Sequence, residues 1–305
     1  IENTLKQFGN THHYIIMGYP PFLKTLVDTS SINWQEYKIT LIMGGESMSE
    51  GMREYLIRKG IKKIYSSLGA SDLELNLAGE NDFTIRFRKL LQENKLLQSK
   101  IMRFTGAIPM IFQYNPTDFF IESSEKGELI VTISRSGYIA PKIRYNLHDR
   151  GHVMQLKEVF EILKELGIDK TSLGKPIVDL PLLLHYGRAD MTVSFFGANI
   201  SPVDIQETLY TLPELNAKIN SFCLNTTEDS NSNKQLNVML ELNDGIKTHD
   251  IDLEKTSVEF FQSLAKINQD FREAYKMTTP ESSPKILLYD FSAGHFKNND
   301  IRIKA

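Results

Sequence analysis

The amino-acid sequence predicts an α/β protein: a parallel or mixed βα sheet with a small β-barrel-like segment in a large domain, followed by a small α+β domain. Three observations predict it. β-rich runs alternate with helical patterns up to residue 65, short strands separated by Pro, Gly and Ser fill residues 108–145, and the alternation restarts after residue 190. The 305 residues suffice for about two domains of roughly 150 residues. We therefore expect a large domain over residues 1–189 and a small mobile domain over residues 190–305.

The composition is that of an ordinary globular protein, with 41% hydrophobic and 24% charged residues. The 35 Lys and Arg against 38 Asp and Glu leave a formal charge of -3, which argues against a nucleic acid as partner. Cys223 is the single cysteine, which excludes a disulfide framework or a Cys-based zinc site within the chain and favours a cytoplasmic location. No apolar stretch reaches the roughly 18 residues of a membrane span, so no membrane partner is expected.

The first part of the chain alternates strand and helix. The expected strands are 14–17, 38–43 and a run that starts at 61–65, and the expected helices are 22–27 and 49–59. Gly18 with the prolines that follow it, Gly44–Gly45 and Gly60 mark the ends of these elements. Ligands of such sheets bind beyond the carboxyl ends of the strands, so the loops after Met43 and Tyr65 are the places to search.

The rest of the chain divides into an antiparallel segment and a C-terminal α+β unit. The expected strands are 110–114, 119–122, 128–134, 142–145, 219–224, 235–242 and 285–291, and the expected helices are 155–166, 202–210 and 253–277. Residues 225–234 (NTTEDSNSNK) are polar throughout, which predicts a mobile hairpin loop.

A first motif, Leu68-Gly69-Ala70-Ser71-Asp72, follows a predicted strand. Glycine lets a backbone approach a phosphate, a hydroxyl can donate to it, and a carboxylate can hold a magnesium ion beside it. The alternative is a turn in which Ser71 or Asp72 caps a helix.

A second motif, Arg144-Tyr145-Asn146-Leu147-His148-Asp149, lies at the expected end of a strand. An ionised Asp149 offers two acceptor oxygens, which suit the two hydroxyls of a ribose. The alternative is an ion pair between Asp149 and Arg144 or Arg150.

The third motif joins Gly187-Arg188-Ala189-Asp190 to Phe196-Gly197 and to a helix that begins at Pro202. Arg188 could supply fixed donors to a nucleotide, and a polar junction could let a second domain change orientation. The alternative is an ordinary linker with a capped helix.

In their order and spacing these segments resemble the adenylate-forming superfamily of acyl-CoA synthetases and adenylation domains, in its phenylacetate-CoA ligase-like branch. Gly44-Gly45-Glu46 resembles the adenine-contacting strand end, Leu68 to Asp72 the segment Y-G-(L/M)-(T/S)-E, Tyr145 to Asp149 the segment Y-R-T-G-D, and Gly187 to Pro202 the segment G-R-x-D…R-G-x-x-(I/V)-x-P.

The resemblance implies a role for each matched residue. Ser71 would contact phosphate, Asp72 would hold Mg²⁺, Asp149 would bind the ribose, and Asp190 would be the hinge. Nucleotide contacts would also come from Gly44, Gly45, Glu46, Tyr65, Gly69 and Arg188. A catalytic lysine near the C-terminus would be Lys304, with Lys297 as the alternative; both lysines could instead be solvated residues of a frayed tail.

The sequence departs from the family pattern in three places. Leu68 replaces an aromatic residue, Asp72 is one methylene shorter than the usual Glu, so that Glu74 is a rival ligand, and residues 146–148 replace R-T-G. The family's Ser/Thr/Gly-rich phosphate loop has no counterpart in residues 1–305. The resemblance therefore implies that the chain lacks the N-terminal phosphate-loop subdomain, or that another polypeptide supplies it.

The function implied by the resemblance is that of an AMP-forming acid-thiol ligase. It would use ATP and Mg²⁺ to activate a small carboxylic acid and would pass the acyl group to coenzyme A or a carrier-protein thiol, in a tunnel near Phe196 and Gly197. The acid pocket would be lined by Tyr19, Phe22 and Leu68, which are apolar and favour an aryl acid. Two alternatives are an adenylyltransferase that stops at the acyl-AMP of a phenazine- or deazaflavin-type acid, and a non-catalytic nucleotide-binding relative.

Overall fold

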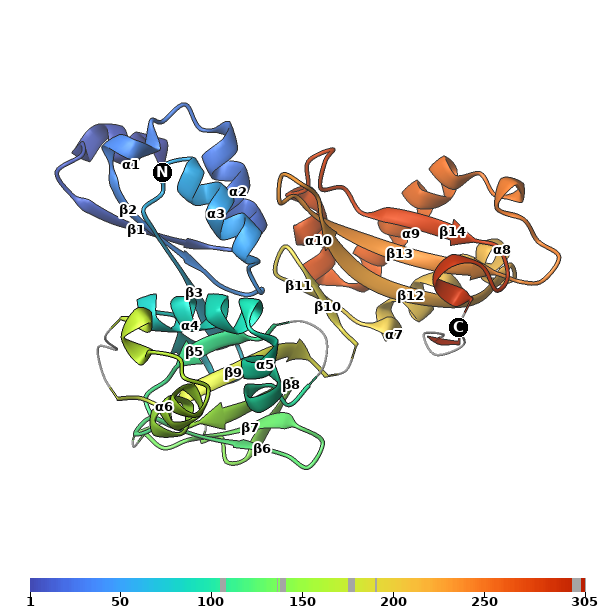
Figure 1. The fold of residues 1–305 in the computed structure, drawn as a ribbon. Helices are drawn as coiled ribbons and strands as arrows, with labels where there is room; N and C mark the ends of the chain where they lie inside the picture. Colours follow the sequence, from blue (N-terminus) through green and yellow to red (C-terminus); the bar gives the residue numbers. More distant parts are fainter. Residues whose placement is uncertain are drawn as a thin grey trace. The chain divides into compact units, whose positions relative to one another are not determined.

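The computed structural model describes residues 1–104, 108–135, 137, 141–174, 179–189 and 191–297, and the backbone of residues 303–304. The chain forms two compact units (Figure 1). The first comprises Ile1–Gly18, Ser30–Ser49 and Ile57–Asp190, and the second comprises Tyr19–Thr29, Glu50–Leu56 and Met191–Ala305. The division into domains at residue 190 stays a prediction.

Among the described residues, the first unit is built on one sheet in the order β1-β2-β3-β4-β5-β9-β8-β7-β6. The strands are β1 (His13–Gly18), β2 (Lys38–Met43), β3 (Lys63–Ala70), β4 (Glu74–Gly79), β5 (Met110–Gln113), β6 (Phe119–Ser123), β7 (Glu128–Ile133), β8 (Tyr145–Met154) and β9 (Leu182–Arg188). The ladders β1·β2 and β2·β3 are parallel, and those from β3·β4 onward are antiparallel. This mixed sheet, together with the helices, confirms the predicted α/β class.

The parallel strands are joined by helical crossovers, because parallel neighbours cannot be linked by a tight turn. The helices and short turns along this stretch are α1 (Glu2–Phe8), α2 (Pro20–Thr29), the 3-10 turn η1 (Trp34–Glu36) and α3 (Glu50–Arg58). On β2, Ile39, Leu41 and Met43 are buried on one face and Thr40 is buried on the other, as expected for an inner strand covered on both faces. The predicted helices 22–27 and 49–59 are confirmed within two residues at each end.

Helices cover one face of the antiparallel part of this sheet (Figure 1). They are α4 (Asp82–Glu93), α5 (Lys95–Ile101) and α6 (Leu156–Glu165), followed by the 3-10 turn η2 (Lys170–Leu173). Phe87 of α4, Val159 of α6 and Leu184 of β9 belong to one buried cluster, in which none of the three is measurably exposed. Apolar residues recur at helical spacing on each helix and form one apolar face, which packs against the sheet.

The other face of the antiparallel part curls around a second buried cluster. Leu77 of β4 and Phe119 of β6 both belong to it, although β4 and β6 lie far apart in the strand order. Arg135, which follows β7, forms an ion pair with Glu74 of β4 and a second with Asp118, which precedes β6. Over the described residues the ladder is nevertheless open, with β1 and β6 as its ends, so the predicted barrel-like segment is a curved continuation of the sheet and not a closed barrel.

The sequence analysis placed several element boundaries wrongly. β8 begins at Tyr145, where the predicted strand 142–145 was expected to end, because Arg144 adopts φ 52° and breaks the extended run. The strand from residue 61 continues to Ala70 as β3. The expected helix 253–277 is divided into α9 (Leu253–Ile267) and α10 (Gln269–Lys276) at Asn268. Strands β4 and β9 and helices α4 and α5 were not predicted.

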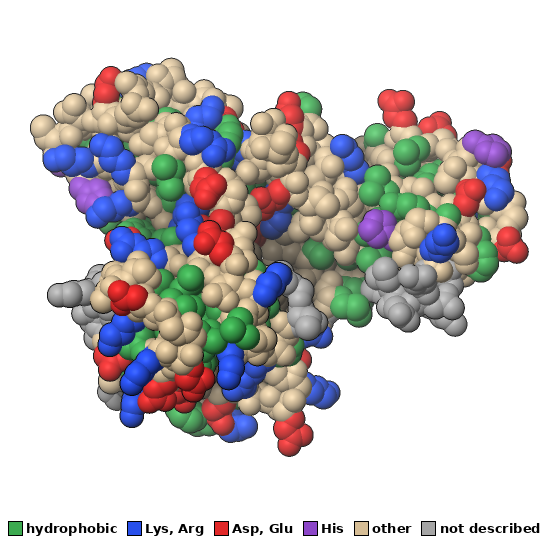
Figure 2. All heavy atoms as spheres, viewed as in Figure 1, with side chains coloured by type: hydrophobic (Ala, Val, Ile, Leu, Met, Phe, Trp, Pro, Cys, Tyr) green, Lys and Arg blue, Asp and Glu red, His purple; other side chains and the backbone are tan. Residues whose placement is uncertain are grey.

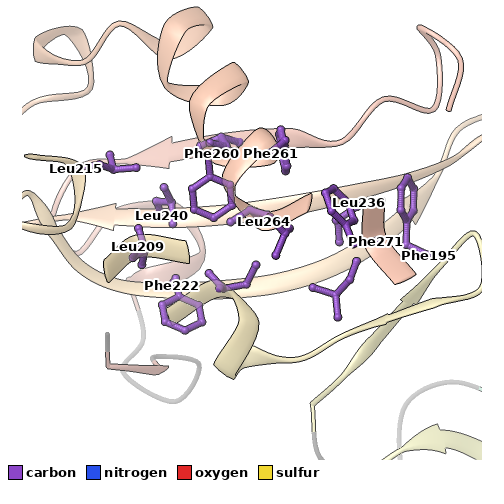
Figure 3. Close-up of a cluster of buried hydrophobic side chains, with 14 of the residues drawn as sticks. Phe195, Leu209, Leu215, Phe222, Leu236, Leu240, Phe260, Phe261, Leu264 and Phe271 are labelled. Atoms are coloured by element: carbon purple, nitrogen blue, oxygen red, sulfur yellow. The ribbon is translucent and has the colours of Figure 1, made fainter. Parts of the chain in front are cut away.

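The second unit contains, among its described residues, a sheet in the order β14-β13-β12-β15. The elements after residue 190 are β10 (Val193–Phe195), β11 (Ala198–Ile200), α7 (Pro202–Tyr210), α8 (Pro213–Asn216), β12 (Ile219–Glu228), β13 (Lys234–Leu242), η3 (Thr248–Asp250), α9, α10, β14 (Lys285–Tyr289), η4 (Gly294–Phe296) and β15 (Ile303–Lys304). Figure 3 shows Phe260 and Leu264 of α9 facing Phe222 of β12 and Leu240 of β13. This buried cluster holds the small sheet against its helices.

The surface carries both signs of charge. On the face drawn in Figure 2, Lys and Arg side chains are interspersed with Asp and Glu. In the part of the chain that the structure describes, no helix is long and apolar enough to cross a membrane.

The predicted hairpin loop over residues 225–234 is shorter than expected, since β12 continues to Glu228 and β13 begins at Lys234.

Candidate functional site

Asp149 and Arg188 lie directly opposite each other on the antiparallel strands β8 and β9. The Arg188 Nη1 atom is 3.5 Å from Asp149 Oδ1 and donates to the carbonyl of Leu147 at 3.1 Å. The backbone N–H of Ala189 also donates to the carbonyl of His148, which continues the ladder past the end of β9. The second and third sequence motifs, 39 positions apart, are therefore brought together by strand pairing, since 188 − 149 is 39.

Neither alternative partner proposed for Asp149 is used. Arg144 pairs instead with Glu122 at 2.5 Å, and the Arg150 guanidinium lies over the Phe104 ring, 5.8 Å from its centre. His185 takes the place of these partners, because its Nε2 lies 3.1 Å from Asp149 Oδ2. The carboxylate of Asp149 is only 13% exposed.

The two oxygens of Asp149 differ in their surroundings. Oδ2 faces the His185 ring, whereas Oδ1 is buried and has no hydrogen-bond partner among the described residues. The Arg188 charge lies near Oδ1 but not in hydrogen-bond geometry. A buried carboxylate oxygen without a donor is costly, which makes Oδ1 the natural place for a donor from a ligand.

Tyr145, the first residue of β8, links this pair to the first motif. Its hydroxyl donates to Asp72 Oδ2 at 2.5 Å, across 73 positions of sequence. The hydrogen bond to the Asp72 carboxylate raises the pKa of Tyr145, and the nearby positive charge of Arg188 opposes that rise. We call Asp72, Tyr145, Asp149, His185 and Arg188 the strand-end cluster; all five belong to the first unit.

Asp72 lies at the tip of the β3–β4 hairpin. Ser71 and Asp72 are exposed turn residues between two strands, so the helix-cap alternative is wrong. Leu68, Gly69 and Ala70 are strand residues and not a loop, which corrects the expected position of the motif. A Cβ on Gly69 would lie 2.2 Å from the carbonyl oxygen of Leu75, so the close approach of the two strands requires glycine.

The remaining nucleotide-binding candidates lie on β2 and β3. Gly44 follows β2 and donates its N–H to the carbonyl of Gly18, and Gly45 adopts φ 79°, which favours glycine. Glu46 is half-buried directly after them. Tyr65 lies inside β3 and not at its end, and its hydroxyl donates to Asp82 at 2.9 Å. These four residues share the first unit with the strand-end cluster.

No family model and no curated protein matches the sequence. Solved structures do match. The chain superimposes on 2-hydroxyisobutyryl-CoA ligase, in complex with 2-HIB-AMP and CoA in the thioesterification state, with a TM-score of 0.53 and 14% identity, over 90% of this chain and 50% of that one. For the amide bond synthetase McbA from Marinactinospora thermotolerans the TM-score is 0.51, with 10% identity over 94% of this chain and 49% of that one.

The fold is that of the adenylate-forming ligases. The resemblance seen in the motifs is confirmed at the level of the fold. The chain spans about half the length of the solved ligases it matches.

Within this ligase fold, the predicted acid-pocket residues are divided between the two units. Leu68 of β3 is half-buried against the cluster inside the curved sheet, in the first unit. Tyr19 and Phe22 are each 40% exposed and belong to the second unit. Each of the three is thus at least partly accessible, and the pocket itself stays a prediction.

The predicted thiol-tunnel residues form the turn of the β10–β11 hairpin. Phe196 and Gly197 have φ 51° and 83°, as in the two-residue turns that match the twist of antiparallel strands. The Phe196 ring is 2% exposed and packs 4.9 Å from the Phe195 ring, so it is a core residue. A Cβ on Gly197 would lie 2.2 Å from the Tyr19 ring, so the backbone of Gly197 faces an aromatic surface.

The predicted hinge and the predicted catalytic lysine lie at the edge of the described residues or outside them. The hinge candidate Asp190 lies outside the described residues. For Lys304 the backbone is described: it belongs to β15 and pairs with Ser221 of β12. Lys297, the alternative, is exposed directly after η4. Their catalytic roles stay predictions.

The residues present fit a nucleotide and a magnesium ion. Mg²⁺ is usually held by one or two carboxylates together with substrate phosphates, and Asp72 offers one exposed carboxylate of this kind. Glu74, the rival ligand, is paired with Arg135. Among the described residues no group of three or more His, Cys, Asp or Glu side chains could hold a metal by itself. Asp149 Oδ1 fits a hydroxyl donor for the reason given above.

His185 is the member of the strand-end cluster that the sequence analysis missed. It belongs to none of the motifs, and its neighbours Leu183 and Leu184 are fully buried. The available signal was a single imidazole directly after the apolar run Leu182-Leu183-Leu184, three positions before Arg188. Only the strand register, which places Gly151 opposite His185, shows that this imidazole can reach Asp149.

Proposed function

We propose that the protein activates a carboxylic acid with ATP to an acyl-adenylate and transfers the acyl group to a thiol such as coenzyme A. The observation that carries the proposal is the buried Oδ1 of Asp149, which has no hydrogen-bond partner in the described structure and lies beside the guanidinium of Arg188. An oxygen of this kind suits a sugar hydroxyl, and a guanidinium suits a phosphate or a carboxylate. The strand-end cluster is thus suited to a nucleotide.

In the first step an oxygen of the substrate carboxylate attacks the α-phosphorus of ATP. The bond from this phosphorus to the oxygen that bridges to the β-phosphate breaks, and pyrophosphate leaves. Because two anions meet, the step needs donors and cations aimed at the α-phosphate. Ser71 supplies a hydroxyl, Arg188 a guanidinium and Lys304 an ammonium group. Asp72 would hold a Mg²⁺ ion, which would neutralise charge at the phosphates when bound.

Tyr145 has a separate task in this step. Its hydroxyl is bonded to one oxygen of Asp72, which fixes the orientation of the carboxylate and leaves the other oxygen for a cation. The raised pKa of Tyr145 keeps the phenol protonated at neutral pH, so the hydrogen bond persists under ordinary conditions. Tyr145 is therefore a positioning residue.

In the second step the sulfur of the acceptor attacks the acyl carbon, the bond from that carbon to the AMP oxygen breaks, and AMP leaves. A change in orientation of residues 190–305 about Asp190 would exchange Lys304 for the backbone of Phe196–Gly197 at the site. The solved structure of the similar 2-hydroxyisobutyryl-CoA ligase contains CoA, and McbA is an amide bond synthetase. A thiol is therefore the first acceptor to test and an amine the second.

The acid is proposed to be flat and apolar. Tyr19 and Phe22 expose aromatic surface, and Leu68 exposes an aliphatic side chain. Surfaces of this composition favour an aryl acid over a charged one, because burying a second charge without a partner is costly.

The test is magnesium-dependent release of pyrophosphate by the full-length protein, with a panel of aryl and fatty acids, each with and without coenzyme A. Asp149→Ala is expected to weaken nucleotide binding by roughly 10- to 100-fold, the equivalent of a charge-assisted hydrogen bond. Glu161→Ala is the matched control, because this carboxylate is 63% exposed on α6, outside the cluster. It should leave release unchanged.

The outcomes separate the functions. Acid-dependent release with a thioester formed only with coenzyme A supports the ligase. An acyl-AMP that no thiol or amine consumes supports an adenylyltransferase. Nucleotide binding without release from any acid supports a non-catalytic relative, and release that is equal in Asp149→Ala and wild type would exclude the assigned site.

A further inference from the structure

We propose that, because of His185, the strand-end cluster binds one hydroxyl of the ribose much more strongly than the other. The inference rests on the proposed function, because it concerns how the same site would hold a nucleotide. A free carboxylate could accept both hydroxyls of a ribose, one on each oxygen. In this chain the two oxygens of Asp149 are not equivalent.

His185 engages one oxygen from inside the protein. Its Nε2 is 3.1 Å from Asp149 Oδ2, and since a carboxylate can only accept, Nε2 carries the proton. The imidazole is 11% exposed and the carboxylate 13% exposed, so solvent competes little for this hydrogen bond. The Phe112 ring packs edge-on against the imidazole with the ring centres 6.4 Å apart, which limits the orientations that the ring can take.

The strand register makes the contact possible. Asp149 is opposite Arg188, while His185 is opposite Gly151, and the register shifts between Arg150 and Gly151. A side chain at position 151 would collide with Leu129, because a Cβ there would lie 2.8 Å from the Leu129 side chain. With this irregular register, the imidazole of His185 reaches diagonally across the ladder to Asp149.

The other oxygen of Asp149, Oδ1, receives no hydrogen bond from the described residues. It is buried and has the Arg188 Nη1 atom at 3.5 Å. A donor that reaches Oδ1 removes a desolvation cost already present in the protein, whereas a donor that reaches Oδ2 must share an oxygen already bonded to His185. Two ribose hydroxyls should therefore contribute unequally to binding.

The role assigned to His185 is that of a positioning residue, since it acts on the nucleotide through Asp149. His185→Leu removes the donor and frees Oδ2, so the two hydroxyls should become nearly equal. His185→Gln places an amide N–H where Nε2 now lies, so the inequality should return. A residue needed only for folding would lower the stability of both variants without changing the ratio between two ligands.

The experiment is calorimetric titration of wild type, His185→Leu and His185→Gln with AMP, 2′-deoxy-AMP and 3′-deoxy-AMP. For wild type we expect one deoxy analogue to bind at least about 10-fold more weakly than AMP and the other at most about 3-fold more weakly. In His185→Leu the two losses should lie within about 3-fold of each other, and in His185→Gln the wild-type pattern should be kept. Thermal melting of each variant verifies that it is folded.

Equal losses for the two analogues in wild type would overturn the inference while leaving the nucleotide site in place. An inequality that persists in a folded His185→Leu would also overturn it, because another group would then be its cause. If wild type binds none of the three nucleotides, the proposed function fails, and the inference fails with it.

Discussion

His152 lies on β8, and its surroundings contrast with those of His185 on β9. It is 1% exposed, its Nε2–H donates to the carbonyl of Ile101 at 3.1 Å, and its ring stacks on Tyr186. Burial, together with the nearby positive charge of Arg103, lowers the pKa of His152 from 6.5 to about 4. The ring is therefore neutral in the folded protein at neutral pH.

This buried imidazole makes the protein acid-sensitive. Between pH 6.5 and 4 the unfolded chain binds a proton that the folded chain rejects, so the free energy of unfolding falls as the pH falls through this window. The loss from His152 alone should be about 2 kcal/mol between pH 7 and pH 5. Urea unfolding at both pH values measures it.

Two variants isolate the contribution of His152. His152→Gln keeps a donor for Ile101 and does not titrate, so the difference between pH 7 and pH 5 should shrink by about that amount. His249→Gln is the matched control, since the side chain of His249 is 81% exposed. An unchanged pH difference in His152→Gln would contradict the assignment.

At the scale of single residues, the sequence predicted which residues carry suitable functional groups better than it predicted which side chains contact one another. The motifs selected Asp149 and Arg188 separately as nucleotide-binding candidates, and strand pairing places the two residues opposite each other. The hydrogen bond between Tyr145 and Asp72 could not be predicted, because it depends on a hairpin tip that reaches a strand 73 positions away. Glu74, the predicted rival to Asp72 as a magnesium ligand, forms an ion pair with Arg135, which the sequence pattern does not show.

At the scale of secondary-structure elements, Asn268 separates α9 from α10. Its side-chain oxygen accepts from the N–H of Phe271 at 2.8 Å and so caps α10. Its side-chain amide donates to the carbonyl of Asn199 and to Asp204 of α7. One side chain thus begins a helix and ties it to β11 and α7.

Asn268→Ala removes three hydrogen bonds and should lower the free energy of unfolding by about 2–3 kcal/mol. Asn94→Ala is the comparison, because Asn94 caps α5 by accepting from the N–H of Leu97 at 2.9 Å. This second change should cost about 1 kcal/mol, as expected for a helix cap. Equal losses in chemical denaturation would mean that the links from Asn268 to Asn199 and Asp204 contribute nothing.

Elements were predicted well where the period was clear and poorly where a local conformation decided the boundary. Helix α6 has a regular apolar face and was found within a residue. The start of β8 was missed because it follows Arg144 in a left-handed conformation, which a pattern of apolar residues does not show. The break at Asn268 was missed because the apolar period continues on both sides of it.

At the scale of the whole molecule, the described residues form separate buried clusters in the two units. Phe87 belongs to the cluster under α4 to α6 in the first unit, and Phe222 to the cluster of the second, and neither ring is exposed. Packing of this kind fixes each unit through its own core. The fold class could be predicted because these two sets of apolar residues follow different patterns on either side of residue 190.

Separate cores predict separate responses to a cavity. Phe222→Ala should lower the free energy of unfolding of the second unit by about 3–5 kcal/mol. The affinity for AMP should stay within about 3-fold of wild type, because the strand-end cluster lies in the first unit. Phe87→Ala should lower the transition of the first unit and weaken AMP binding. Calorimetry with and without AMP makes the comparison, and a single transition shifted equally by both changes would contradict it.

Strand β3 belongs to two ladders at once. Residues 63–66 pair with the parallel strand β2, and residues 67–70 pair with the antiparallel strand β4, whose hairpin tip carries Asp72. Ladder hydrogen bonds hold both halves of β3, with an irregularity between Leu68 and Ala70, so a displacement of one half is transmitted to the other. An acid that presses on Leu68 would thereby shift the carboxylate two residues beyond Ala70. If the proposed acid binds at Leu68 and the proposed cation at Asp72, β3 would couple the two binding events.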